Sequence, residues 1–245
     1  MSLDQKKINK TNIENFFKER AINHDIKNPL KSVIYQDKNP SLAKKRDNYE
    51  KNKIKKILKP SKSDVILDIG CGIGRWAEEM SGSVKEYVGI DYISEFIDIA
   101  NAKYKNNTNT HFICLDGTKL SNLEVKNLSP YTIVMIIGFF MYIDNEEIYD
   151  VLNQVLKVSN EETQILIREP IGVDKEVVLN NVWSNEMETH YSATYRTCDQ
   201  FKKIFNDVLI KEGYSLVVDE KLFPDELNNR IDTRQHLFIL KKISI

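Results

Sequence analysis

The spacing of hydrophobic residues changes near residue 64. Upstream, apolar side chains are sparse and recur at helical intervals, as in Ile13, Phe16 and Phe17. Downstream, short apolar runs alternate with stretches of helical periodicity. The runs are 65–69, 86–90, 111–115, 131–137 and 164–168, and the helical stretches are about 74–80, 94–105 and 145–158. This alternation predicts right-handed crossovers and a mostly parallel sheet covered on both faces by helices.

The first sixty residues are expected to form a helical lid or cap (1–60), followed by one larger domain (61–245). Thr11–Glu14 has the spacing of a capping box. Asn39 is an expected N-cap with Pro40 at the first helical position, and this long helix should run to about Leu58 before Lys59-Pro60 ends it.

The last part of the chain breaks the alternation. A helix is expected at about 197–212, followed by strands 214–222 and 235–242 with no helix between them. Two strands joined in this way should pair antiparallel at the sheet edge. Residues 170–196 are a long insertion before that helix, and a segment of this length in a compact domain is usually a functional lid.

Composition narrows the function classes. The chain has 245 residues and a formal net charge of −1, with no polybasic block, so neither nucleic acid nor an anionic membrane is an expected partner. The longest apolar stretch, 131–143, is too short to span a bilayer, and the N-terminus lacks a signal peptide's apolar core. Three scattered cysteines predict no disulfide frame and no structural metal site, as expected of a cytoplasmic protein.

The first strand runs into a glycine-rich loop, in the stretch VILDIGCGIGRW at 65–76. A dinucleotide-binding loop needs G-x-G-x-x-G, and Arg75 occupies the third glycine position. Asp68, at the strand end, would repel a pyrophosphate. Asp91 ends the second strand, 19 residues after Gly72, where an acid accepts hydrogen bonds from ribose hydroxyls. The loop therefore suits a nucleoside that carries positive charge instead of phosphate.

The stretches VILDIGCGIGRW, YVGID and CLDGTKL, in this order, resemble the successive cofactor motifs of class I S-adenosylmethionine-dependent methyltransferases. The resemblance covers about 64–170. It implies a Rossmann-like three-layer α/β/α sandwich whose seven-stranded sheet has the order 3-2-1-4-5-7-6, with an antiparallel strand 7 near the edge. It also implies S-adenosylmethionine as cofactor and S-adenosylhomocysteine as product.

The resemblance assigns cofactor contacts residue by residue. These are Asp68, Gly70 and Gly72 at the methionine portion, Asp91 at the ribose, Tyr92 beside the adenine, Asp116 with Gly117 and Thr118 at the adenine amino group, and Ile137 with Gly138 at the end of the fourth strand. Arg46 or Arg75 could hold the methionine carboxylate. Tyr35 and Trp76 could close over the sulfonium, which an aromatic face favours.

Catalytic candidates must lie at the same sheet edge or in the lid. Tyr142 follows the fourth strand, where it could contact substrate or simply pack. Glu169 could be a base or could pair with Arg168. His190 in the insertion could be a general base or a solvated side chain. The expected substrate-binding residues are Tyr191, Tyr195, Arg196 and Arg168.

The acceptor is expected to be a small molecule, because no Asn/Asp-Pro-Pro-aromatic signature of nucleic-acid amine methylation follows the fourth strand. The main hypothesis is O-methylation of a sugar, a nucleotide-linked sugar or a related biosynthetic intermediate, which would need a base. Two alternatives are N-methylation of an amine or phospho-amine, and a cofactor-binding domain without catalysis. Both a monomer and a homodimer are compatible with the sequence.

Overall fold

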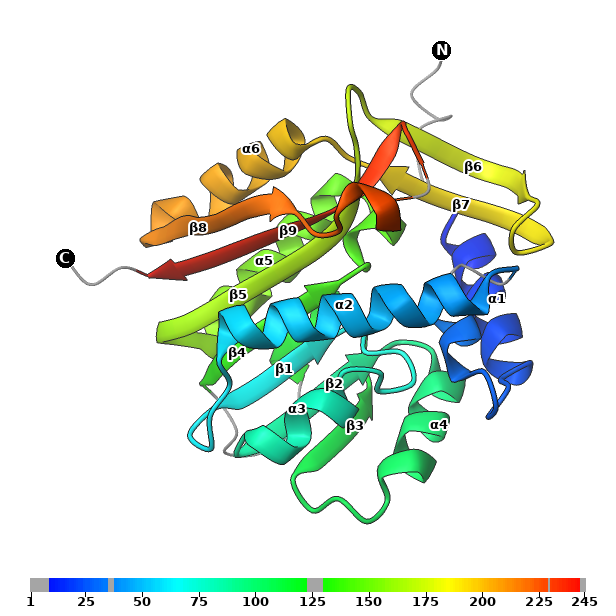
Figure 1. Cartoon of the computed structure of the whole chain (residues 1–245). Coiled ribbons are helices and arrows are strands. Elements are labelled where there is room, and N and C mark those ends of the chain that lie inside the picture. The colour runs from blue at the N-terminus through cyan, green and yellow to red at the C-terminus, as the bar shows by residue number, and fades with distance from the viewer. Residues whose placement is uncertain (1–8, 35–37, 123–129, 229, 243–245) are drawn as a thin grey trace.

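The computed structural model describes residues 9–34, 38–122, 130–228 and 230–242. Its centre is a seven-stranded sheet with the order β3-β2-β1-β4-β5-β9-β8 (Figure 1). The strands are β1 Val65–Ile69, β2 Glu86–Asp91, β3 Thr110–Cys114, β4 Tyr131–Ile137, β5 Ser159–Gly172, β8 Tyr214–Lys221 and β9 Thr233–Lys242. The first five pair parallel, whereas β9 pairs antiparallel with both β5 and β8.

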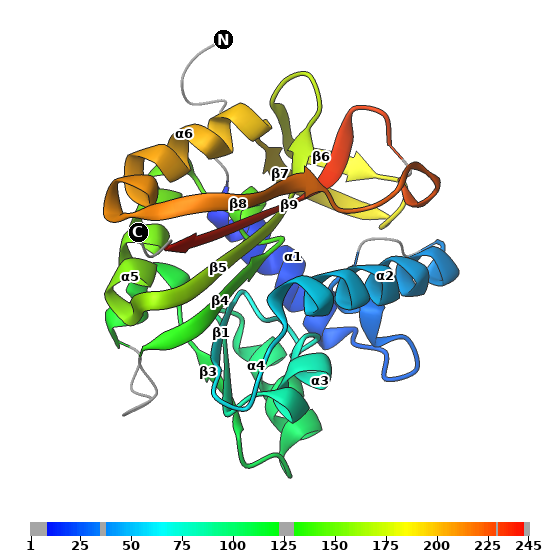
Figure 2. The same ribbon diagram turned by 60° about the vertical axis from the view of Figure 1, so that its left-hand side comes forward.

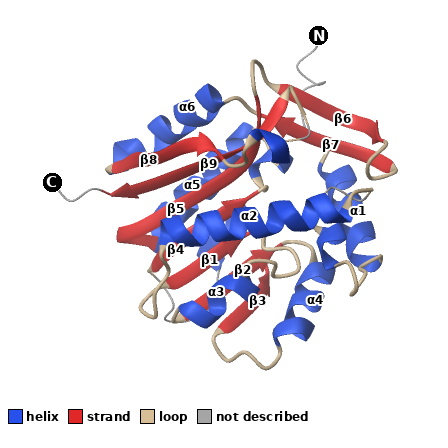
Figure 3. Ribbon diagram, viewed as in Figure 1, coloured by secondary structure: helices blue, strands red, loops and turns tan. Residues whose placement is uncertain are grey.

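Two further strands lie outside this sheet. β6 (Val177–Ser184) and β7 (Thr189–Tyr195) pair antiparallel as a separate hairpin, which Figure 3 shows apart from the main sheet and next to α1. Because the hairpin takes numbers 6 and 7, the last two strands of the main sheet are numbered 8 and 9. The order is otherwise the expected 3-2-1-4-5-7-6, with the antiparallel strand where it was predicted.

Helices cover both faces of the sheet, which gives three layers (Figure 2). One face is covered by α2, α3 and α4, and the other by α5 and α6. The helices are α1 Lys10–Ile22, α2 Pro40–Leu58, α3 Ala77–Met80, α4 Ser94–Tyr104, α5 Asn145–Val158 and α6 Cys198–Val208. Short 3₁₀ turns occur at Pro29–Ser32, Ser81–Ser83, Gly117–Asn122, Phe140–Tyr142, Ile210–Glu212 and Asp225–Leu227. The Rossmann-like prediction is confirmed.

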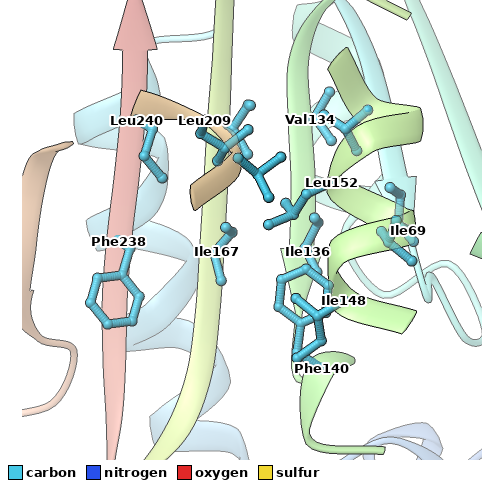
Figure 4. Close-up of a cluster of buried hydrophobic side chains, with 14 of the residues drawn as sticks. Ile69, Val134, Ile136, Phe140, Ile148, Leu152, Ile167, Leu209, Phe238 and Leu240 are labelled. Atoms are coloured by element: carbon cyan, nitrogen blue, oxygen red, sulfur yellow. The ribbon is translucent and has the colours of Figure 1, made fainter. Parts of the chain in front are cut away.

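The largest hydrophobic cluster lies between the sheet and helices α5 and α6 (Figure 4). Ile136 of β4 and Ile167 of β5 are fully buried there, opposite Ile148 and Leu152 of α5. Parallel strands covered on both faces need apolar side chains on both faces, which is why the run from 131 to 137 is almost continuously apolar.

The helix boundaries follow local capping chemistry. Asn9 caps α1 by accepting a hydrogen bond from the Asn12 N–H, so the capping box expected at Thr11 is wrong and Thr11 lies inside the helix. Asn39 caps α2 with Pro40 at its first position, as predicted, and Lys59 ends that helix in the left-handed conformation. α2 buries Ile54 and Leu58 in the same cluster as the sheet, while the expected division at residue 60 stays a prediction.

The insertion at 170–196 adopts a form that the sequence analysis did not predict. Its first residues prolong β5 to Gly172, and the rest forms the β6–β7 hairpin. α1 packs against the inner face of this hairpin, where Ile13 and Phe16 meet Tyr191 and Ala193. Within the described residues no helix combines the length and the hydrophobicity needed to cross a lipid bilayer.

Candidate functional site

A cavity of about 790 Å³ lies at the carboxyl ends of the parallel strands. Its walls come from the loops after β1, β2, β3, β4 and β5, from α1 and α2, and from the β6–β7 hairpin. This is the edge at which open α/β sheets bind ligands. The cavity brings together most of the residues that the sequence assigned to a cofactor, and it adds others.

The glycine loop forms the floor of the cavity. Gly70 has a φ of 75°, and a Cβ there would come within 2.9 Å of the Phe139 ring. Gly72 has a φ of 54°, and its N–H donates to the Asp91 carboxylate over 2.9 Å. Both positions therefore require the left-handed freedom of glycine, and their bare backbone leaves room for a ligand.

Three carboxylates lie at or just after the carboxyl ends of the neighbouring strands β1, β2 and β3, and we call this part of the cavity the donor end: Asp68, Asp91 and Asp116. The Asp91 carboxylate accepts from the N–H groups of Gly72 and Ile93, each over 2.9 Å. Burial raises the pKa of Asp91 to about 6, although these backbone donors oppose the shift. Each Asp91 oxygen keeps a lone pair, so it can still accept from a ribose hydroxyl.

Asp68 lies deeper, at the end of β1. It is 2 % exposed and accepts a hydrogen bond from the Tyr87 hydroxyl. Burial raises its pKa to about 6, against the opposing effects of Tyr87 and of the Arg75 guanidinium. A buried carboxylate of this kind is stabilised by a ligand that brings a positive charge close to it.

Some of the remaining cofactor candidates line the cavity and others do not. Tyr92, Gly117 and Ile137 line the cavity as expected. Asp116 accepts from both the N–H and the hydroxyl of Thr118, each over 2.9 Å. Thr118 thus holds Asp116 in place and does not itself line the cavity, which corrects its assignment as a direct contact. Tyr35 falls outside the described residues.

The two arginine candidates for the methionine carboxylate differ. Arg75 is buried and donates to Asp47 and Glu50 over 2.6 and 2.8 Å, so its guanidinium is already neutralised and the assignment to a ligand carboxylate is not supported. Arg46 lines the cavity, with Nε donating to the Leu227 carbonyl over 2.7 Å. The indole N–H of Trp76 is buried in the same wall, and among the described residues it finds no acceptor.

Glu50 joins two of these arginines. Its carboxylate accepts from Arg75 and, through the other oxygen, from Nε of Arg168. Burial would raise the pKa of Glu50, but the guanidinium groups of Arg168 and Arg75 outweigh burial and hold it below its ordinary value. Arg168 also donates to Gln235 over 3.0 Å. It lines the cavity as expected, with much of its hydrogen-bonding capacity used inside the protein.

A cluster of three tyrosines, Tyr142, Tyr191 and Tyr195, also lines the cavity. The hydroxyls of Tyr142 and Tyr191 are 2.9 Å apart, and Phe17 of α1 meets Tyr142 edge to face at 4.9 Å. Burial raises the pKa of Tyr195, although a hydrogen bond with Tyr191 opposes the shift. Tyr191 and Tyr195 were expected substrate contacts and Tyr142 was a catalytic candidate, and the structure brings all three to the cavity.

His190 does not reach the cavity. It alternates with Tyr191 on β7, so the two side chains project to opposite faces of the hairpin. Its Nδ1 lies 3.0 Å from the Asn181 carbonyl, and its ring packs edge-on against the exposed Trp183. This placement argues against His190 as a general base.

Glu169 and Arg196 also do not line the cavity. The fully buried Glu169 carboxylate accepts from the N–H groups of Phe139, Phe140 and Met141, and burial raises its pKa to about 7. Arg196 is 3 % exposed and donates to Asn145 and to two carbonyls of the same loop. Both residues fix the loop after β4. Neither lines the cavity, so the catalytic and substrate-binding assignments are corrected to positioning roles.

Two further residues that were not predicted, Arg230 and Arg234, line the cavity from the link between β8 and β9 and from the start of β9. The signal for them was the pair of arginines in NNRIDTR, within a link for which no helix was predicted. A cluster of Cys198, Asp219 and His236, whose potential metal-ligating atoms lie within 4.8 Å of one another, was also not predicted. These three come from α6, β8 and β9, so no sequence spacing signals them.

Comparison with known proteins identifies the fold and the family. A sequence profile described as a methyltransferase domain matches residues 66–162, which begin in β1 and end in β5. Residues 66–162 therefore contain a methyltransferase domain, and the fold is that of the class I S-adenosylmethionine-dependent methyltransferases. The methyl donor of this family is S-adenosylmethionine, and the donor end described above lies within the matched residues or beside them.

Two phosphoethanolamine N-methyltransferases are similar to this methyltransferase. Number 3 of Arabidopsis thaliana is 25% identical over 94% of the chain, and the chain spans 44% of that protein. The structure of enzyme 1 of Haemonchus contortus, with phosphoethanolamine and S-adenosylhomocysteine, superposes with a TM-score of 0.71 at 16% identity, covering 100% of this chain and 50% of that one. This methyltransferase therefore spans about half the length of these relatives.

A third similar structure is of a chain whose length is comparable to that of this one. The DhpI–SAH complex superposes with a TM-score of 0.64 at 10% identity, over 94% of both chains. At such identities the superpositions establish the shared fold of the methyltransferase and nothing finer.

Proposed function

We propose that this chain transfers a methyl group from S-adenosylmethionine to the nitrogen of a small phosphorylated amine. The observation that carries the proposal is the tyrosine cluster: three hydroxyl groups line the acceptor side of the cavity, while His190 and Glu169 lie outside it. O-methylation of a sugar hydroxyl needs a base at the acceptor oxygen. An amine needs only to lose one proton before it attacks.

The donor end fits a sulfonium nucleoside. Bare backbone at Gly70 and Gly72 gives a cradle that a Cβ would obstruct, and Asp91 offers acceptors for ribose hydroxyls. The indole N–H of Trp76, which has no acceptor in the part of the chain that the structure describes, and the Arg46 guanidinium border the same space, and both suit a carboxylate. Bound S-adenosylmethionine would supply an electrophilic methyl group on a positively charged sulfur.

The chain's own residues would then align the acceptor and exclude water. A nitrogen held by the tyrosine hydroxyls would share the cavity with the donor end. The hydroxyls of Tyr142 and Tyr191 would pass the ammonium proton of the acceptor to water before the nitrogen attacks. The nitrogen lone pair would then form the new N–C bond, and the electron pair of the broken S–C bond would stay on the sulfur of the neutral product. Phe17 and Ile13 of α1 and Leu179 of the hairpin provide apolar walls around this space.

The similarity to phosphoethanolamine N-methyltransferases supports the amine over the sugar. The experiment is methyl transfer from isotopically labelled S-adenosylmethionine to phosphoethanolamine, ethanolamine and a panel of nucleotide sugars. We expect label and a mass increase of one methyl group in the phosphorylated amine. Transfer to a sugar alone would overturn the proposal, and binding of the donor with no transfer to any acceptor would favour a domain without catalysis.

A further inference from the structure

The acceptor side of the cavity ends at a wall shared with a second cavity of about 370 Å³, which we call the annex. Five residues line both spaces: Phe223, Asn228, Arg230, Arg234 and Gln235. Beyond this wall the annex is bordered by Lys221 and by the apolar side chains of Val173 and Ile231. Two arginines and a lysine are therefore gathered around one small volume.

The shared wall of the main cavity carries positive charge. The donor end holds Asp68, Asp91 and Asp116, whereas the shared wall holds Arg230 and Arg234. Asp225 is the carboxylate that borders the annex, and it is bonded to Lys221 over 2.8 Å. Among the described residues neither arginine of the wall forms a salt bridge. Their charges are thus available to an anion.

Arg234 shows the clearest sign of a missing partner. It lies on β9, opposite Ile171 of β5, and its Nε–H is buried without an acceptor among the described residues. Its guanidinium contacts the thiol of Cys198, a weak acceptor. A buried charged donor left without an acceptor costs stability. A phosphate oxygen at this point would remove that cost and could pair with a guanidinium in bidentate geometry.

Arg230 connects the wall to the tyrosine cluster. Arg230 and Tyr195 both line the main cavity, where the charge of Arg230 opposes the rise in the pKa of Tyr195 that burial causes and the charge of Asp232 adds to it. A ligand that places a nitrogen at the tyrosines would therefore place an anionic group, a few bonds away, at Arg230 and Arg234.

We infer that Arg230 and Arg234 form an anion subsite that binds the phosphate of the acceptor. This inference rests on the proposed function for the source of the anion. The subsite itself rests on the charges and on the unpartnered Nε. The phosphate could be a terminal monoester or a diester whose second substituent occupies the annex.

The test uses inorganic phosphate as the probe, so that it does not depend on knowing the acceptor. Binding to the wild type is measured by ³¹P NMR titration in the presence of S-adenosylhomocysteine. We expect Arg234→Gln and Arg230→Gln each to weaken phosphate binding at least fivefold, and the double variant to abolish it. Lys211→Gln is the charge-matched control on a surface remote from both cavities and should bind phosphate as the wild type does. An unchanged affinity in the double variant, or no phosphate binding by the wild type, would overturn the inference.

Competition then identifies the source of the anion. Phosphoethanolamine and glycerophosphoethanolamine are each titrated against bound phosphate. Displacement by the monoester alone indicates a subsite closed toward the annex, displacement by both indicates that a diester fits, and displacement by neither overturns the link to the acceptor. If phosphate binding depends on both arginines but no phosphorylated amine is methylated, the proposed function fails and the subsite stands.

Discussion

The hydroxyl groups of Tyr142 and Tyr191 lie 2.9 Å apart, although 49 positions separate the two residues in the chain. Tyr142 follows β4 and Tyr191 lies on β7 of the hairpin, so this contact joins the methyltransferase sheet to the insertion. It also puts two groups able to relay a proton beside the acceptor space.

The tyrosine pair should matter for turnover and not for donor binding. We expect Tyr142→Phe and Tyr191→Phe each to lower kcat about tenfold or more, the lower end of typical contributions from positioned proton-transfer groups. The affinity for S-adenosylmethionine should stay unchanged. Tyr149→Phe is a matched control, because that hydroxyl bonds Asp207 outside the cavity. The double variant should cost less than the sum of the singles if the two hydroxyls act together; wild-type kcat in both single variants would rule out this role.

Asp91 should determine donor affinity. Asp91→Ala removes the acceptor for the ribose hydroxyls and the anchor for the Gly72 N–H, so we expect at least tenfold weaker binding of S-adenosylmethionine in calorimetry. Asp150→Ala, at an exposed position on α5, is the control and should leave the affinity unchanged. Equal affinities for the Asp91 variant and the wild type would remove Asp91 from the site.

Donor binding should also depend on pH in a definite direction. Burial raises the pKa values of Asp68 and Asp91 to about 6, so the free protein holds both as carboxylates only above that pH. Because the sulfonium and the ribose hydroxyls favour the ionised forms, affinity should change little between pH 8 and about 6. Below pH 6 it should fall by about tenfold per unit for each group that must ionise. Calorimetry from pH 8 to 5 tests it, and a flat profile would contradict it. Asp91→Asn should flatten the profile in part.

Glu169 should matter for stability because it binds the loop after β4. Glu169→Gln leaves a single acceptor oxygen for three N–H donors, and a buried N–H without an acceptor costs about 1–3 kcal/mol. Urea unfolding should show a loss of that size, whereas the exposed Glu162→Gln should change the free energy of unfolding by less than about 0.5 kcal/mol. An unchanged midpoint in the Glu169 variant would show that the loop does not need this anchor.

Chelation tests whether transfer needs a metal ion. The proposed transfer needs none, so activity should persist after prolonged treatment with EDTA. Loss of activity that Mg²⁺ restores would require a different account of how the acceptor is activated. The cluster of Cys198, Asp219 and His236 is a separate matter, because Lys202 already pairs with Asp219 over 2.6 Å and His236 bonds the same carboxylate.

The donor end could be predicted from the sequence because its residues follow consecutive strands. Asp68 and Asp91 are each the polar residue at or next to the end of an apolar run, and parallel strands bring such ends to one edge. The acceptor side could not be predicted in the same way. Whether Tyr191 or His190 faces inward depends on the register of the hairpin, and a shift of one residue exchanges them.

Glu169 and Arg196 were wrongly predicted to contact ligand for a different physical reason. Glu169 and Arg196 are charged and lie at the correct sheet edge, which made them candidates. Their partners, however, are backbone groups of the loop after β4, and no property of the sequence specifies such contacts. A charged residue next to a site can therefore anchor the backbone while an uncharged one such as Tyr142 contacts the ligand.

The ion pairs around Glu50 attach α2 to the loop after β1 and to the end of β5. Glu50 and Asp47 on α2 neutralise Arg75 of the glycine loop, and Glu50 also neutralises Arg168 at the end of β5. A chain shortened to start after α2 would lose the carboxylate partners of both guanidinium groups and would expose the apolar face of the sheet that Ile54 and Leu58 cover. Deletion of the first sixty residues should therefore yield an aggregating fragment and not a smaller enzyme, so α2 is as much part of the catalytic body as the strands are.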